Sequence, residues 1–393
     1  MSAPLPHTAP QAPVDPFAPG ERGIAEPHPA RAALRAAGPI VQAEAPAGGP
    51  VWIVTDGALA RQVFRHPHIV KDPARAPAHW DPRTAGLEPT AAEQPSLTTL
   101  DGPPHTRLRR AHTPLFGADR TAAWEERITE LAREMLTGLA AAGGTVDLAA
   151  DFTTRFPLTV LCDLIGVPRD RVDEAIAACR GMHGGPAEVA AAMDAFTGLA
   201  AAALHGGRRG LAAELRDTLQ DSGAEADLHY LLFTLIFAGQ LTTDPALGYL
   251  LAHLLDEDRA APADPDEAAA EVLNRHSPAP FSLWRFTDRE VELAGVRLPE
   301  RSPVLVDIQG INTGPDGRIG PDLVFGAGAH YCTGAPGPHR ADRAGPGAPR
   351  RPARRPAGGA LRRAAPDRLR RHPGQQAHRA AGPAARLKGR RGG

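Results

Sequence analysis

The chain has 393 residues and a formal net charge of -1, and 42% of its residues are hydrophobic, enough to bury a sizeable core. Charged residues make up 23%, which argues against disorder of the whole chain. Its three cysteines, Cys162, Cys179 and Cys332, are too few for a disulfide framework and suit a reducing cytoplasm. We expect no secretory signal, because no basic region followed by an apolar run begins the sequence. The longest apolar stretch, 231–239, is too short to span a bilayer.

The charge is unevenly distributed along the chain. From Ala335 to Gly393 there are 15 Arg and one Lys against two Asp, and only three Leu among the large apolar residues. Such a segment offers no packed core face. It could be a basic arm for nucleic acid or an acidic membrane, or a natural disordered tail. We favour a shifted reading frame, because Ala, Gly, Pro and Arg have the codons richest in G and C.

The predicted elements are mostly helical. After a loose Pro- and Ala-rich arm at 1–20, a β-branched run predicts a strand at 51–56. Helical patterns follow at 58–66, 103–116, 122–142, 156–168, 170–182 and 187–220.

The longest apolar helical pattern covers 228–256 and is apolar nearly all round, so we expect this helix to run through the core. Another helix is predicted at 264–278, and short strands at 282–287, 291–299 and 303–308. The fold class is therefore mainly α with small β-sheets (α+β), in one large unit.

The segment from Phe325 to Gly334, FGAGAHYCTG, is the most informative for function. Its glycines, Gly328 among them, let the backbone turn tightly and aim N–H groups at the Cys332 sulfur, as a metal-ligating thiolate requires. Phe325 offers a flat apolar surface to a planar cofactor, and His330 is placed to reach a peripheral anionic group. The alternatives are a glycine-rich turn with an incidental cysteine, a phosphate loop lacking its Lys-Ser/Thr, and a zinc site with too few ligands.

At every fixed position this segment resembles the cysteine-ligand signature of the cytochrome P-450 family, the haem-thiolate monooxygenases. The resemblance implies that Cys332 is the proximal ligand of the iron of haem b and that His330 bonds a haem propionate, with Phe325 and Gly328 in the cofactor-binding loop. It also implies a long central helix over the haem within a domain at 21–335. Residues 1–20 are then a flexible arm, and residues 336–393 are a tail that is disordered or out of frame.

His105 and Arg109 stand four residues apart, on one face of the helix expected after Asp101. Two cationic donors on one face suit a carboxylate partner, although an ordinary solvated basic face gives the same pattern. The pair resembles the family's His-x-x-x-Arg motif, which implies propionate binding. Arg285 resembles a further propionate-binding arginine, a role in which lysine is a poor substitute.

The long helix carries the sequence AGQLTT from Ala238 to Thr243. Small side chains at Ala238 and Gly239 leave room for O₂ and substrate, and Thr242 supplies a hydroxyl that relays protons. We expect Thr242 to donate to the Ala238 carbonyl and Pro245 to favour a kink. The alternative is helix packing by small residues with an incidental threonine.

Two positions depart from the family. Leu241 stands where the oxygen-activation motif has an acid, so Gln240 or ordered water would have to serve the proton route. Asn274 occupies the arginine position of the Glu-x-x-Arg motif, and Arg275 stands one residue later, four residues after Glu271.

By this resemblance the chain is a haem-dependent monooxygenase that inserts one oxygen atom of O₂ into a small hydrophobic substrate of the secondary-metabolite kind. Its electron donors are a separate ferredoxin and ferredoxin reductase, because no flavin or dinucleotide domain is appended. We expect a cytoplasmic protein with no nucleic-acid or membrane partner. The alternatives are a haem-binding protein of this fold without normal turnover (a pseudo-enzyme or peroxygenase) and the non-folding product of a damaged gene.

Overall fold

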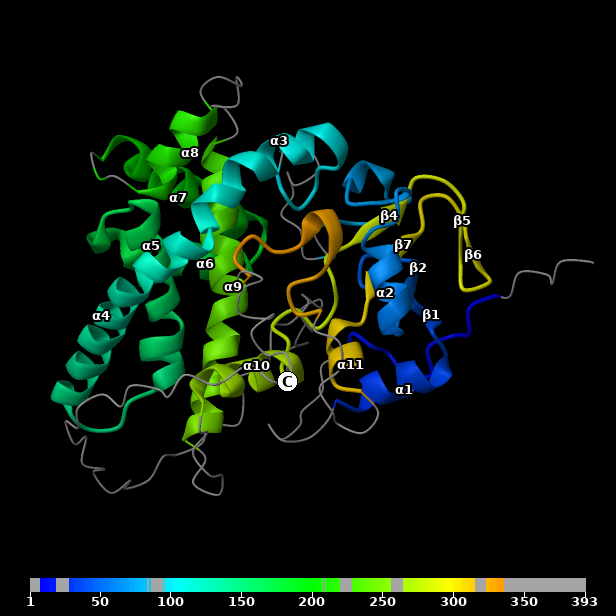
Figure 1. The fold of residues 1–393 in the computed structure, drawn as a ribbon, viewed down its shortest axis with the longest axis horizontal. Coiled ribbons are helices and arrows are strands. Elements are labelled where there is room, and N and C mark those ends of the chain that lie inside the picture. Colours follow the sequence, from blue (N-terminus) through cyan, green and yellow to red (C-terminus); the bar gives the residue numbers. More distant parts are fainter. Residues whose placement is uncertain are drawn as a thin grey trace, which may run out of the picture.

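The computed structural model describes residues 8–18, 28–82, 85, 94, 96–206, 208, 210–219, 228–255, 264–314 and 323–335. The predicted tail at 336–393 and part of the arm at 1–20 lie outside these ranges. Figure 1 shows a helical part beside a part built on a small sheet, with the loop at 323–335 (orange) between helix α9 and the sheet.

Eight helices make up the helical part within the described ranges. They are α3 (Gly102–His112), α4 (Ala118–Ala142), α5 (Arg155–Ile165), α6 (Val172–Gly181), α7 (Pro186–His205), α8 (Leu211–Leu219), α9 (Leu228–Leu254) and α10 (Pro265–Arg275). Local sequence explains several ends. Helix α5 stops at Gly166, whose φ of 103° is left-handed, and Asp264 caps α10 by accepting from the Asp266 amide. The predicted helices are thereby confirmed, with 187–220 divided into α7 and α8.

The sheet part contains five strands in the order β1-β2-β7-β4-β3 and a separate β5-β6 hairpin. The strands are β1 (Ile40–Glu44), β2 (Pro50–Val54), β3 (Ile69–Val70), β4 (Arg285–Thr287), β5 (Val291–Leu293), β6 (Val296–Leu298) and β7 (Pro303–Val306). Strands β2 and β7 run parallel, and the other pairs are antiparallel. Helices α1 (Pro29–Ala37), α2 (Gly57–Val63) and α11 (Ile308–Asn312) complete this part. Strand β4 begins with Arg285, which is buried.

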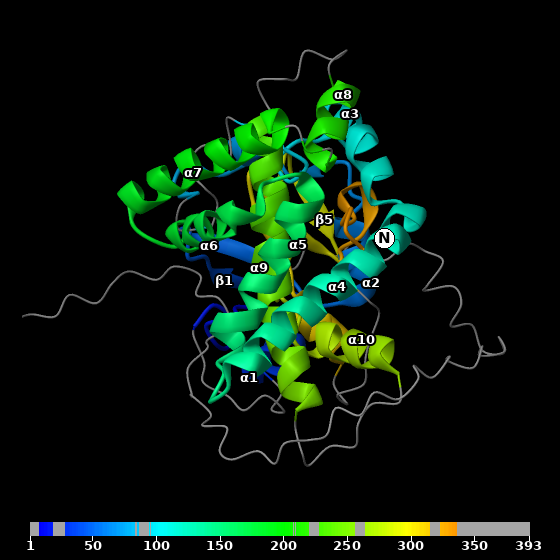
Figure 2. The ribbon, with the colours of Figure 1, turned by 90° about the vertical axis from the view of Figure 1, so that its left-hand side faces the viewer.

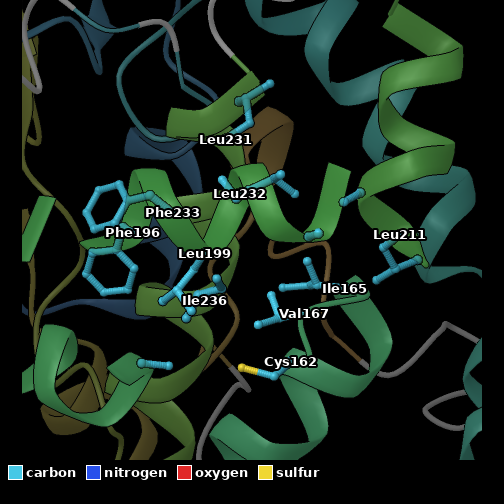
Figure 3. Close-up of a cluster of buried hydrophobic side chains, with 14 of the residues drawn as sticks. Cys162, Ile165, Val167, Phe196, Leu199, Leu211, Leu231, Leu232, Phe233 and Ile236 are labelled. Atoms are coloured by element: carbon cyan, nitrogen blue, oxygen red, sulfur yellow. The ribbon is translucent and has the colours of Figure 1, made fainter. Parts of the chain in front are cut away.

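The largest core cluster joins α5, α6, α7 and α8 to the first half of α9 (Figure 3). Phe196 of α7 lies 4.9 Å from Phe233 of α9 between ring centroids. Among the described helices, α7 alone is long and apolar enough to cross a membrane by length and hydropathy. Because Phe196 and Leu199 belong to the core cluster, its apolar character has an explanation within the fold.

The prediction that the whole of α9 runs through the core is correct for its first half only. Buried residues in α9 extend from Leu228 to Gln240, whereas residues 241–253 are mostly half-buried and Leu254 is 44% exposed. Figures 1 and 2 show α6, α7 and α8 gathered around one end of this helix. The second half of α9 is covered only in places, as where the Tyr249 ring stacks on the His276 ring at 4.2 Å between centroids.

Candidate functional site

The cysteine loop turns on two left-handed glycines. Gly326 and Gly328 have φ of 72° and 74°, which a glycine adopts without strain. A Cβ at Gly328 would lie 2.5 Å from the carbonyl oxygen of Phe64, so no larger residue fits there. The loop closes where the Cys332 amide donates to the Phe325 carbonyl at 3.0 Å, leaving Cys332 exposed. Among residues 323–335 no amide donates to the sulfur, so that part of the expectation is not supported.

Helix α3 brings its two predicted residues to this loop. The buried His105 ring lies 4.1 Å from the His330 ring between centroids. Arg109, one turn later, is close enough to Cys332 for the sulfur to act on its pKa. Burial lowers the pKa of Arg109, and Cys332 works in the opposite direction.

Arg285 approaches from β4. It is 4% exposed, and its guanidinium lies 5.0 Å from the centroid of the Phe64 ring. Burial lowers the pKa of Arg285 to about 10. The structure therefore gathers His105, Arg109, Arg285 and His330 from three separate segments around the exposed cysteine.

Asp101 is the carboxylate at the centre of this group. Its Oδ1 lies 3.1 Å from Nε2 of His330, and its Oδ2 accepts from the Lys71 amide at 2.6 Å. His330 Nδ1 faces the Leu97 carbonyl at 3.1 Å. Burial acts to raise the pKa of Asp101, but the hydrogen bonds from His330 and Lys71 outweigh it, and the pKa lies below its ordinary value.

Lys71 is a residue that the sequence analysis missed. Its Nζ donates to the Trp284 carbonyl at 2.9 Å, and its side chain is buried. Burial, and then the charge of Arg285, holds the pKa of Lys71 well below its ordinary value. A lysine directly after the two-residue strand β3 carries no local signal, so only the tertiary structure reveals it.

The donors of this cluster fit an acidic planar cofactor. His105 Nε2 and Arg285 Nε are buried and have no hydrogen-bond partner among the described residues, and such orphans are costly unless an acceptor reaches them. Burial, and then the neighbouring cations, lowers the pKa of His105 to about 4. A carboxylate would satisfy both donors, and the exposed Cys332 thiol is the soft ligand that haem iron takes in thiolate enzymes. The residues present therefore fit haem b.

The hydrogen bond expected within the α9 motif is confirmed. Thr242 Oγ1 donates to the Ala238 carbonyl at 3.0 Å, and Ala238 is exposed although it lies inside the longest helix. A Cβ at Gly239 would lie 2.8 Å from a terminal carbon of Leu161, so Gly239 packs closely against α5. The role of Gly239 in leaving room for O₂ stays a prediction. The helix continues through Pro245, and the kink expected there stays a prediction.

Two further expectations can be compared with the geometry. Gln240 donates to the Thr154 carbonyl at 3.0 Å and to Asp244 at 3.2 Å, on the other side of α9 from Thr242, so it does not replace the missing acid. Arg275 does pair with Glu271, at 3.2 Å, while Asn274 is buried and donates to the Ala270 carbonyl.

A comparison with protein-family models gives no match. The cytochrome P-450 monooxygenase DoxA of Streptomyces peucetius subsp. caesius is 39% identical over 367 residues, covering 83% of this chain and 87% of that protein. The chain belongs to the cytochrome P-450 family. The vitamin D(3) 25-hydroxylase of Pseudonocardia autotrophica is 31% identical and covers 79% of this chain and 82% of its own.

Solved cytochrome P-450 structures share the fold. CYP154C4 from a Streptomyces species has a TM-score of 0.71 at 22% identity, covering 84% of this chain and 87% of its own. CYP154A1 from Streptomyces coelicolor has a TM-score of 0.65 at 25% identity, covering 78% and 84%. The predicted fold class, the haem b cofactor and the monooxygenase activity are thereby confirmed, and O₂, an organic substrate and redox partners follow from the family.

Proposed function

We propose that this cytochrome P-450 binds haem b through Cys332. The basic side chains beside the cysteine loop hold the two haem carboxylates. The observation that carries the proposal is the pair of buried, unpartnered donors, His105 Nε2 and Arg285 Nε, beside an exposed thiol. Arg109 and His330 complete the donors, and Phe325 and Gly328 shape the loop. When bound, the haem supplies the activation of O₂.

The chain's own contribution to oxygen activation centres on Thr242. Its hydroxyl is held by the Ala238 carbonyl and stands on a face of α9 that the described protein leaves accessible at Ala238. A hydroxyl there can pass a proton, whereas the apolar Leu241 cannot. Since Gln240 is turned away, water bonded to Thr242 is the remaining route for protons.

The substrate we propose is a small hydrophobic molecule of the secondary-metabolite kind. Relatives named vitamin D(3) 25-hydroxylase and 2-hydroxy-5-methyl-1-naphthoate 7-hydroxylase support an apolar ring system and a hydroxylation. The exposed Ala238 suits such a molecule because its side chain is a methyl group.

For electron donors we propose a ferredoxin and its reductase. Arg107 and Arg110 of α3 are exposed and line a pocket between α3 and α8, on the helix that also carries Arg109 towards Cys332. An acidic ferredoxin would be attracted to this surface. A cytoplasmic location fits the three cysteines, all free thiols.

A cytochrome P-450 without normal turnover is the second candidate, and it is favoured by Leu241 and by the burial of Asn274 in place of the expected arginine. Product formation with ferredoxin, reductase and NADPH supports the monooxygenase. Activity driven only by peroxide supports the peroxygenase alternative.

Replacing the ligand tests the haem assignment. Cys332→Ser should abolish the thiolate-type carbon monoxide spectrum of the reduced protein, because serine provides no sulfur ligand. Cys179→Ala is the matched control, since burial raises the pKa of the Cys179 thiol to about 12 and excludes it as a ligand. A thiolate spectrum that survives in Cys332→Ser contradicts the assignment.

Replacing Thr242 tests the proton route. Thr242→Ala should keep the haem spectrum but raise peroxide release per product, because the hydroxyl is lost while the helix remains. The measurement is the ratio of product to NADPH consumed. If that ratio stays unchanged, Thr242 is a packing residue.

A further inference from the structure

A second polar cluster lies behind the oxygen-activation motif. The Asp244 carboxylate accepts from the hydroxyls of Thr153 and Thr154 at 2.7 and 2.9 Å, and from Gln240 Nε2 at 3.2 Å. The same Gln240 nitrogen donates to the Thr154 carbonyl at 3.0 Å. We call these four residues the α9 clamp. It ties α9 to the chain that leads into α5.

The threonines of the clamp stand at an unusual turn. Residues Ala149–Thr153 form a π-helical turn, and Thr154 begins the passage into α5. Such wide turns are rare and cost stability, so they persist where they place particular side chains. Here two successive hydroxyls reach the same carboxylate, and Thr153 is only 2% exposed.

The clamp and the catalytic motif occupy opposite faces of α9. At about 100° per residue, Gln240 and Asp244 share one face, while Ala238 and Thr242 lie about 200° away from Gln240. Gly239 adds a close contact with Leu161 of α5 near the clamp. One face of the helix is thus fixed by neighbouring segments, and the other is accessible at Ala238.

Helix α9 needs support from neighbouring segments between Ala238 and Pro245. Pro245 has no amide hydrogen to donate to the Leu241 carbonyl, and the Thr242 hydroxyl adds a bond at the Ala238 carbonyl that loosens a helix. Two consecutive turns are therefore weakened. A half-buried carboxylate that accepts three hydrogen bonds holds this part of α9 against the chain that leads into α5, since hydrogen bonds to a charged group are among the stronger ones.

We propose that Asp244 is a positioning residue, which through the α9 clamp fixes the rotation of α9 so that Thr242 is held on the accessible face. Asp244 stands three residues after Leu241, the position where the acid is missing, but it acts on the helix and not on protons. This inference rests on the role proposed for Thr242.

The test replaces the acceptor and its donors in the full-length haem-loaded protein. Asp244→Asn keeps the size but removes the charge, and Thr153→Val and Thr154→Val remove the donors with little change in volume. Asp173→Asn is the matched control, because that carboxylate is 77% exposed and pairs with Arg155 at the start of α5. Hydrogen exchange of amides 238–248 is compared with that of α7, and product is measured against peroxide.

We expect Asp244→Asn to accelerate exchange in 238–248 by about tenfold, leave α7 unchanged and raise peroxide per product, because the helix regains local freedom. Combining it with Thr153→Val and Thr154→Val should add little further effect, since all three act through one cluster. Asp244→Glu should restore part of the coupling. The proposal is overturned if amides 238–248 of Asp244→Asn exchange at the wild-type rate. It is also overturned if they exchange faster while the ratio of peroxide to product stays unchanged, provided that Thr242→Ala raises that ratio.

The proposed function can fail separately. If Thr242→Ala leaves coupling unchanged while Asp244→Asn still loosens 238–248, the clamp exists but its target is not Thr242, and the positioning role is overturned. If Cys332→Ser keeps the thiolate spectrum while the exchange result holds, the haem assignment fails and the clamp remains.

Discussion

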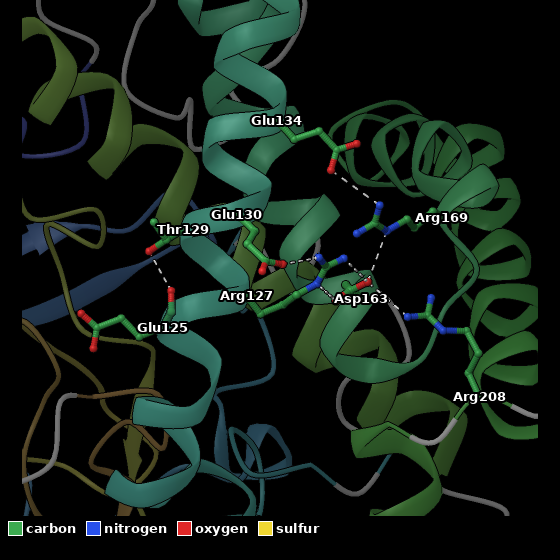
Figure 4. A network of polar contacts seen from close by, with 8 residues as sticks. All are labelled: Glu125, Arg127, Thr129, Glu130, Glu134, Asp163, Arg169 and Arg208. Atoms are coloured by element: carbon green, nitrogen blue, oxygen red, sulfur yellow. Dashed lines mark hydrogen bonds and ion pairs between the residues drawn. The ribbon is translucent and has the colours of Figure 1, made fainter. Parts of the chain in front are cut away.

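Asp101 and Asp163 each lie among several basic side chains, of which Lys71 and Arg285 near Asp101 are buried and the arginines near Asp163 are partly exposed. The Asp101 cluster is largely buried and joins Lys71, Arg285 and His330 beside the cysteine loop. The Asp163 cluster lies on the surface of the helical part, where arginines converge on the carboxylate from three segments (Figure 4). The contacts are with Arg127 at 3.0 Å, Arg169 at 3.3 Å and Arg208 at 3.1 Å.

The two clusters differ in their balance of charge. Around Asp163, Arg127 also pairs with Glu130 and Arg169 with Glu134. Hydrogen bonds with Asp163 and Glu130 raise the pKa of Arg127 above its ordinary value. Around Asp101 the balance is reversed, because burial lowers the pKa of both Lys71 and Arg285.

This difference separates a ligand site from a stabilising surface network. A buried group of cations with too few carboxylates destabilises the fold until another anion joins it, whereas exposed and fully paired charges contribute modestly to stability. In a cytochrome P-450 the anion is available from the carboxylates of haem b. Variants in the two clusters should therefore act on different properties.

The largest effect is expected at Arg285. Arg285→Ala should weaken haem binding by about 10- to 100-fold, the range typical of residues that support a metal cofactor, because the unpartnered Nε is lost. Titration of the haem-free protein with haem, followed by absorbance, measures the dissociation constant. Arg285→Lys should recover only part of the affinity, since lysine lacks the planar fork.

Arg208→Ala in the Asp163 cluster is the matched control. Its side chain is 43% exposed, and we expect the haem dissociation constant to stay at the wild-type value. Equal haem affinities for Arg285→Ala and Arg208→Ala would remove the distinction between the clusters.

A smaller effect is expected at Asp101. Asp101→Asn leaves Lys71 and Arg285 without their carboxylate, so the free energy of unfolding of the haem-free protein should fall by about 2 kcal/mol. The haem-loaded protein should lose less, because the haem carboxylates supply negative charge to the same cations. Urea unfolding of both forms measures the difference. An equal loss in both forms would show that Asp101 and the haem do not share these cations.

Local sequence was sufficient to predict most helices and the cysteine loop. Gly328 and the spacing from His105 to Arg109 depend on neighbours in the chain, so they could be read directly. The contact between Asp101 and His330 joins residues 229 positions apart, and no local pattern predicts it. Strand β1 and helix α1 were missed for a similar reason, because their burial depends on partners elsewhere in the fold.

The orientation of side chains around α9 is the second feature that the sequence alone could not predict. The motif from Ala238 to Thr242 was recognised, but the sequence could not show that Gly239 meets Leu161 or that Gln240 faces Thr154. An apolar helix gives no hydrophobic face from which its rotation can be deduced. The sequence could not show that the second half of α9 is half-buried either, because burial there depends on which distant segments pack against it.

The smallest effect is expected at Asp163, and it should depend on pH. Burial acts to raise the pKa of Asp163, but hydrogen bonds from Arg127 and Arg208 outweigh it, so the folded-state pKa lies below the ordinary carboxyl value. Such a group stabilises the fold above the ordinary pKa and loses that contribution as the pH falls through the folded-state pKa. Asp163→Asn should therefore cost about 1 kcal/mol or less at neutral pH, and nothing once acid has protonated the carboxylate, because its partners are exposed and screened. Melting temperatures of the two proteins across the acidic range measure this convergence. None of the contacts between described residues of the Asp163 cluster reaches the cysteine loop, so the haem dissociation constant should not change. A change there would show that the two clusters are coupled.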